Sequence, residues 1–90
     1  MDNNFVYDKE KQSTLNEYIS KHFITTNNPY DRLHTSSINL ILNKQGYFQH
    51  TIELGRLLKR MNIGRYNIKC YVDGKGKGGF EFIKYIENNV

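Results

Sequence analysis

The chain has 90 residues, a net charge of +4 at pH 7 and a single cysteine. This length allows one domain with a small core, and no window approaches the roughly 20 apolar residues of a membrane span. The start, MDNNFVYDKEK, has no apolar targeting segment, so we expect a soluble, cytoplasmic protein. One cysteine excludes an internal disulfide, and the three histidines lack metal-ligand spacing; we expect no metal and no cofactor.

The charge is distributed unevenly along the chain. Residues 1-31 carry three lysines against five carboxylates, whereas residues 32-90 carry ten lysines and arginines against four carboxylates, giving −2 and +6. Concentrated positive charge in a small domain indicates a polyanionic partner. A merely solvated basic face is the alternative interpretation.

A helical pattern begins after Ser13. Apolar residues recur at i, i+3, i+4 and i+8 from Leu15, which is the spacing of one helical face. The pattern predicts a helix over residues 14-23, with Ser13 or Thr14 as its cap.

The segment ITTNNPYD interrupts this helix, because β-branched residues followed by the only proline favour an extended stretch and a turn. A short strand at Leu33 and His34 can follow. INLILNKQG then predicts a second helix over residues 36-45, ended by Gly46 in the left-handed conformation.

A third helix is predicted over residues 51-61. At roughly 100° per residue, its leucines and methionine fall on one side and its basic residues on the other, so the helix is amphipathic with a basic outer face. The basic residues are Arg56, Lys59 and Arg60.

After Gly64 the apolar period changes from 3.6 to 2 residues, which predicts strands. One strand is expected over residues 66-72 and a second over 80-86, with DGKGKGG as the loop of a long hairpin. Glycines in this loop would let it follow a phosphate backbone closely, and Lys75 and Lys77 would neutralise the phosphates.

The order of the predicted elements is helix, helix, helix, strand, hairpin loop, strand. This order predicts an α+β fold, a winged helix-turn-helix. Residues 1-12 are expected to be a flexible segment and residues 13-90 the domain. In that fold the third helix enters the major groove and the hairpin, or wing, lies against the DNA backbone. The predicted DNA-binding residues are Thr51, Arg56, Lys59, Arg60, Arg65, Lys69, Lys75 and Lys77.

Each of these signals has an ordinary structural alternative. GKGKGG lacks the strand-to-helix context of a nucleotide-binding P-loop, but it can be a hairpin loop without any ligand. Arg56 can pair with Glu53 on a solvated face. Most tyrosines are expected in the core, whereas Tyr47 and Tyr71 are candidates to stack on bases of a single strand.

Catalysis has little support in the sequence. Asp31, His34 and Ser36 or Ser37 include the residue types of a hydrolytic triad, but nothing in their spacing forms a nucleophile elbow. The two serines are better explained as helix caps. We therefore expect no enzymatic activity.

The segment LGRLLKRMNIGRYNIKCYVDGKGKGGFEFIKYI, residues 54-86, resembles the winged-helix domain that closes many phage, plasmid and large-DNA-virus primase-helicases. The shared pattern is a large apolar residue, Gly-Arg, two apolar residues, a short basic stretch and an apolar hairpin, which Leu54 to Leu58 begin. The resemblance covers roughly residues 13-86 and implies DNA binding during replication initiation. The chain has no Walker motif and no helicase body, so the enzymatic activity of those proteins does not carry over.

Together these observations predict a DNA-binding domain linked to replication or regulation of a mobile element or virus, with double-stranded DNA favoured over single-stranded DNA. The alternative is a protein-interaction module, a small inhibitor or adaptor that docks on an acidic partner surface. A protein partner within a replication complex is a further candidate. DNA binding that is absent at low salt, or that does not depend on salt, would favour the alternative.

Overall fold

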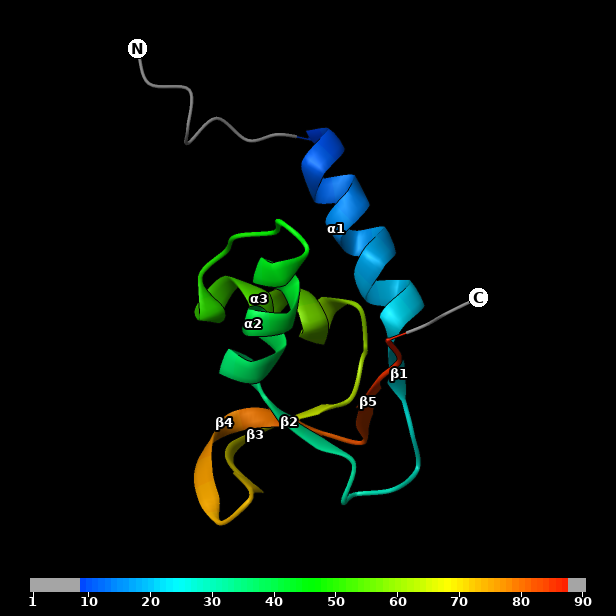
Figure 1. Cartoon of the computed structure of the whole chain (residues 1–90). Coiled ribbons are helices and arrows are strands. Elements are labelled where there is room, and N and C mark those ends of the chain that lie inside the picture. The colour runs from blue at the N-terminus through cyan, green and yellow to red at the C-terminus, as the bar shows by residue number, and fades with distance from the viewer. Residues whose placement is uncertain (1–8, 88–90) are drawn as a thin grey trace.

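The computed structural model describes residues 9–87 and has an α+β architecture of three helices and two antiparallel sheets. The helices occupy the upper part of Figure 1 and most of the strands its lower part. The elements are α1 (Lys9–His22), β1 (Phe23–Thr25), β2 (Arg32–His34), α2 (Thr35–Lys44), α3 (Thr51–Arg60), β3 (Arg65–Val72), β4 (Lys75–Glu81) and β5 (Ile83–Tyr85).

Helix α1 begins at Lys9, five residues before the predicted start. Ser13 and Thr14 therefore lie inside the helix, and the predicted cap is wrong. The segment KEKQ consists of residues with high helix propensity, a signal that the spacing of apolar residues does not contain. The proposed flexible segment 1-12 stays a prediction, since residues 1–8 lie outside the described part of the chain.

The other two helices were predicted to within one residue at each end. Gly46 has a φ of 88°, which confirms its role as the left-handed residue after α2. The expectation that Ser36 or Ser37 caps α2 is wrong, because the residue at the N-cap position is His34 and it makes no side-chain cap hydrogen bond.

Strands β2, β4 and β3 form a three-stranded antiparallel sheet in that order. Phe80 of the central strand β4 is paired with Leu33 of β2 on one side and with Tyr66 of β3 on the other. The short strand expected at Leu33 and His34 is thus confirmed. A β-bulge between Asn67 and Cys70 interrupts the pairing of β3 with β4.

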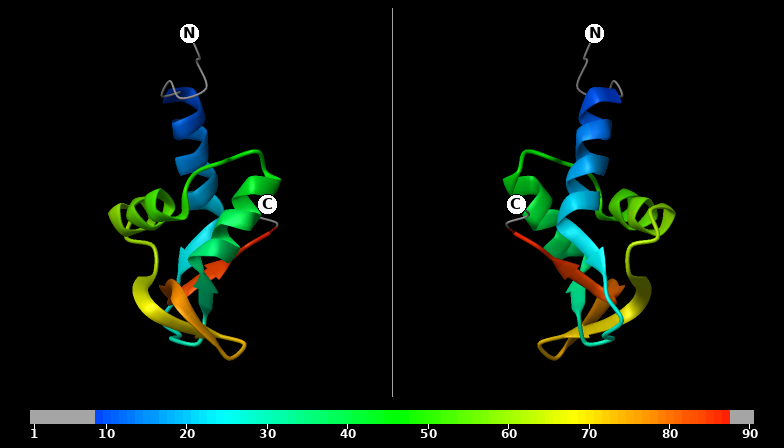
Figure 2. Two further views of the ribbon diagram at one scale, coloured as in Figure 1. Left: turned by 90° about the vertical axis from the view of Figure 1, so that its left-hand side faces the viewer. Right: turned by 90° about the vertical axis from the view of Figure 1, so that its right-hand side faces the viewer.

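The predicted hairpin loop DGKGKGG is wrong in extent. Only Asp73 and Gly74 form the turn, with φ values of 52° and 77° that suit a two-residue type I′ hairpin turn. Lys75 to Glu81 pairs with β3, so the lysines stand on a strand and not on a flexible tip. The hairpin projects below the helices in both views of Figure 2.

Aromatic rings explain how a glycine-rich segment becomes a strand. A Cβ built on Gly76 would lie 2.6 Å from the ring of Tyr71, and one on Gly78 would lie 3.0 Å from the hydroxyl of Tyr66. Both glycines therefore make room for a cross-strand aromatic ring, an arrangement that compensates for glycine in a strand. The sequence pattern of alternating apolar residues cannot reveal this pairing.

The predicted strand over residues 80-86 is in fact two strands. Phe82 has a φ of 57°, which a strand does not accommodate, so β4 ends at Glu81 and β5 begins at Ile83. Strand β5 pairs antiparallel with β1, joining Tyr85 to Phe23. The end of α1 is thereby tied to the C-terminal part of the described chain.

The core lies between the helices and the two sheets. Its buried apolar residues come from every helix and from β1, β4, β5 and the segment before β3: Leu15, Ile19, Phe23, Ile38, Leu42, Leu54, Leu57, Leu58, Ile63, Phe80 and Ile83. Tyr18 and Tyr85 pack at its edge, and their hydroxyls are 2.9 Å apart. This core fixes α3 relative to the β3–β4 hairpin.

Tyr18 provides a test of this packing. Burial, and then its hydrogen bond with Tyr85, raises the pKa of Tyr18 to about 12 from 10.0. The folded state therefore holds the phenolic proton to a higher pH than the unfolded chain does, so this contribution is complete below about pH 10 and is lost as pH rises toward about 12. Thermal melts between pH 9 and pH 11 should show a steeper loss of stability for the natural chain than for Tyr18→Phe; equal slopes would contradict the prediction.

Candidate nucleic-acid interface

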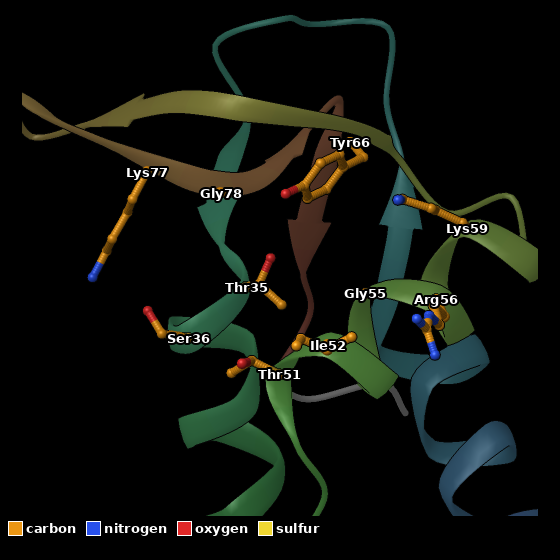
Figure 3. A pocket seen from close by; sticks show the side chains of 10 residues that line it. All are labelled: Thr35, Ser36, Thr51, Ile52, Gly55, Arg56, Lys59, Tyr66, Lys77 and Gly78. Atoms are coloured by element: carbon orange, nitrogen blue, oxygen red, sulfur yellow. The ribbon is translucent and has the colours of Figure 1, made fainter.

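A hollow of about 530 Å³ lies between the N-terminal end of α2, helix α3 and the β3–β4 hairpin (Figure 3). The residues that line it are Thr35, Ser36, Thr51, Ile52, Gly55, Arg56, Lys59, Tyr66, Lys77 and Gly78.

The hollow is strongly cationic. Its lining includes the guanidinium of Arg56 and the ammonium groups of Lys59 and Lys77, and none of the 10 residues is a carboxylate. Cations that surround one depression reinforce one another's potential and attract anions. The arrangement suits a ligand with several negative charges.

Four of the eight predicted DNA-binding residues meet in this hollow, namely Thr51, Arg56, Lys59 and Lys77. The other four are exposed but do not line it. Arg60 instead lines a second depression, of about 420 Å³, between α1 and α3. Arg65, Lys69 and Lys75 stand on the hairpin strands.

Sequence reasoning missed the contribution of α2 and the position of Tyr66. Thr35 was not singled out and Ser36 was interpreted as a helix cap, yet both residues line the hollow. Tyr66, expected among the candidates for the core, is 39% exposed. Its ring lies under the ammonium of Lys59, with Nζ 4.2 Å from the ring centroid, a cation–π contact that joins α3 to β3.

The expectations for the other two tyrosines have different outcomes. Tyr71 is exposed, but its ring covers Gly76 on the hairpin. Tyr47 is only partly buried and packs against the core. Neither ring lines the hollow.

The alternative role of Arg56 as a partner of Glu53 finds no support in the described residues. The salt bridges among the described residues join Lys21 to Glu17 at 3.8 Å and Arg32 to Glu81 at 3.7 Å. Among the residues whose side chains are described, 12–87, Arg56 therefore makes no ion pair, and it is available to a ligand.

His34 fixes the hairpin relative to α2. The side chain is buried, and its Nε2 lies 2.8 Å from the carbonyl oxygen of Cys70 and 3.0 Å from that of Lys75. Since both partners are acceptors, Nε2 carries the proton and donates. The ring is thus used structurally and does not form a triad with Asp31 and a serine.

Residues 9–87 contain no group of three or more His, Cys, Asp or Glu side chains arranged to hold a metal ion. None of the helices in this part of the chain is long and apolar enough to cross a bilayer. Burial, with a smaller effect of Glu81, raises the pKa of the Cys70 thiol, which disfavours the reactive thiolate.

Comparison of the chain with protein-family models, with curated protein sequences and with solved structures gave no match. The resemblance to primase-helicase tails therefore stays a prediction from the sequence.

Proposed function

We propose that this chain is a winged-helix DNA-binding domain. The observation that carries the proposal is the cationic hollow between α3 and the β3–β4 hairpin, with three cations and no carboxylate in its lining. The order α1, β2, α2, α3, β3, β4, with β2 paired to β4, supports it, because in that fold the third helix and the hairpin face the DNA together.

In the proposed complex, α3 enters the major groove and the hairpin lies along the backbone. Arg56, one turn into α3 and exposed, would hold a guanine edge by two hydrogen bonds. Lys59 and Arg60, near the end of α3, would meet phosphates. The lysines of β4 would neutralise phosphates from a paired strand, with less conformational freedom to lose on binding than a loop has.

The biological setting follows the sequence similarity and is part of the proposal. It is replication or regulation of DNA in a mobile element or virus, in the cytoplasm, by binding and without catalysis of its own.

DNA binding can be tested by its salt dependence. If about five phosphates are neutralised, the logarithm of the affinity for duplex DNA should fall with the logarithm of salt concentration at a slope of about −4 to −5. Fluorescence anisotropy between 50 and 300 mM salt measures the slope. A slope near zero, or no binding at 50 mM salt, would reject the proposal.

One observation favours the alternative of a protein-docking module. Leu40 on α2, Phe48 before α3 and Ile52 on α3 are 62%, 76% and 68% exposed, which is high for large apolar side chains. Substituting Phe48 by Ser should leave DNA affinity unchanged if DNA is the partner of the hollow. A chain without salt-dependent DNA affinity whose binding to a protein requires Phe48 would support the alternative.

A further inference from the structure

Helix α2 begins in the wall of the hollow with an open N-terminus. His34 occupies the N-cap position, but its ring bonds to hairpin carbonyls and provides no cap hydrogen bond. The first turn contains no acidic residue. The N–H groups of a first turn have no partners within the helix and carry partial positive charge, so this end of a 10-residue helix favours an anion.

Thr35 gives a second, independent indication of a ligand. The residue is only 8% exposed and lines the hollow, yet its Oγ1 has no hydrogen-bond partner among the described residues. An unpaired buried hydroxyl destabilises the folded state, and such groups are rare in native proteins. In Figure 3 the hydroxyl points toward the hairpin, on the side of the Tyr66 hydroxyl. It is a hydrogen-bond donor without an acceptor.

The neighbouring polar groups in the hollow supply further donors. Ser36, next to Thr35 in the first turn of α2, adds a hydroxyl. Lys77 of β4 adds an ammonium group, and its side chain extends from the hairpin toward the side of α2 on which Ser36 lies (Figure 3). The acceptor that matches several hydroxyl, N–H and ammonium donors is an anion with several oxygens. Phosphate has this chemistry and is the repeating anion of DNA.

We infer that the N-terminus of α2 seats one phosphate group of bound DNA. The Thr35 hydroxyl and the first-turn N–H groups donate to the phosphate oxygens, and Lys77 neutralises the charge. This inference rests on the proposed function and extends it, because it adds the first turn of α2 to the DNA-contacting elements. A phosphate contact carries no sequence information, so the seat strengthens binding to all sequences equally.

Thr35→Val removes the hydroxyl and keeps the shape of the side chain. It should weaken duplex binding by about tenfold, the loss of one hydrogen bond to a charged group, for every sequence in a randomised library. The melting temperature should stay the same or rise, because an unpaired buried hydroxyl is removed. Thr35→Ser, which keeps the hydroxyl, should retain binding, and Thr14→Val on the exposed side of α1 is the matched control.

A second measurement does not depend on DNA. Titration of the full chain with inorganic phosphate, compared with chloride at equal ionic strength, should shift the amide resonances of Thr35 and Ser36 in an NMR spectrum, and Thr35→Val should reduce the shift. Affinities for duplexes with 5′-phosphate and with 5′-hydroxyl ends should also be compared. A higher affinity for the 5′-phosphate duplex indicates that the site binds a terminal phosphate, and equal affinities indicate that it binds an internal one.

The outcomes separate the seat from the proposed function. If the natural chain binds duplex DNA, Thr35→Val binds equally well and phosphate leaves both amides unmoved, the seat is wrong and DNA binding stands. If phosphate shifts the amides in a Thr35-dependent way while no duplex is bound, the anion seat stands and the DNA-binding function is wrong.

Discussion

Gly79→Ala should destabilise the domain by about 3 kcal/mol, the upper part of the range for overpacking a closely packed site. A Cβ at this position would lie 2.7 Å from the carbonyl oxygen of Leu33, 2.9 Å from Cα of His34 and 3.1 Å from Cβ of Cys70. Two of these atoms belong to the backbone of β2, so relief requires the sheet to separate. For a domain of this size the melting temperature should fall by roughly 12–24 °C.

Gly76→Ala is the matched control for this experiment. The atoms that a Cβ would meet there belong to the ring of Tyr71, which is half exposed and can rotate outward. Alanine also costs less conformational entropy than glycine in a strand, so the net change should be less than about 1 kcal/mol. Thermal unfolding followed by circular dichroism compares the two variants. Equal losses would show that the β2–β4 contact does not hold the hairpin in place.

The contrast between these glycines also shows which parts of the fold the sequence predicts. The apolar spacing of α2 and α3 and the alternation in β3 depend on local periodicity, so these elements were located to within about one residue. The strand character of β4 depends on rings from β3 that lie over Gly76 and Gly78. Such a contact joins residues across a turn, and glycine by itself indicates a loop.

The change of sheet at Phe82 was missed for a similar reason. FEFIKYI alternates continuously in the sequence, but its first residues pair with β2 and β3, whereas its last residues pair with β1. The choice depends on where α1 places β1, which no local pattern contains.

Only part of the candidate site was predicted, because a sequence shows which residues are charged but not where they lie in the fold. The basic face of α3 follows from helical periodicity, which identified Arg56 and Lys59. Thr35 is a different case, since threonine at a helix start is ordinary. Its burial and its missing hydrogen-bond partner become visible only in the folded structure.

Replacing Arg56 and Lys77 together by glutamine should have the largest effect on DNA binding. The two residues come from α3 and β4 and line the same hollow, whose lining contains no carboxylate. If each makes a charge-assisted hydrogen bond of about 1.5 kcal/mol, the affinity at 50 mM salt should fall by about 100-fold or more. The salt slope should become shallower by about 1 if Arg56 contacts a base, and by about 2 if both contact phosphates.

The slope thus also determines whether Arg56 contacts a base edge, the role that the proposed complex assigns to it. A randomised duplex library should show flatter sequence preference for the double variant in the first case and unchanged preference in the second. Lys44→Gln combined with Lys84→Gln is the matched control, because it removes the same charge from two exposed residues outside the hollow. If both double variants lose affinity equally, net charge alone attracts the DNA and the hollow is not the binding surface. If neither loses affinity while both remain folded, α3 and the hairpin do not face the DNA, and the protein-docking alternative becomes the better explanation of this surface.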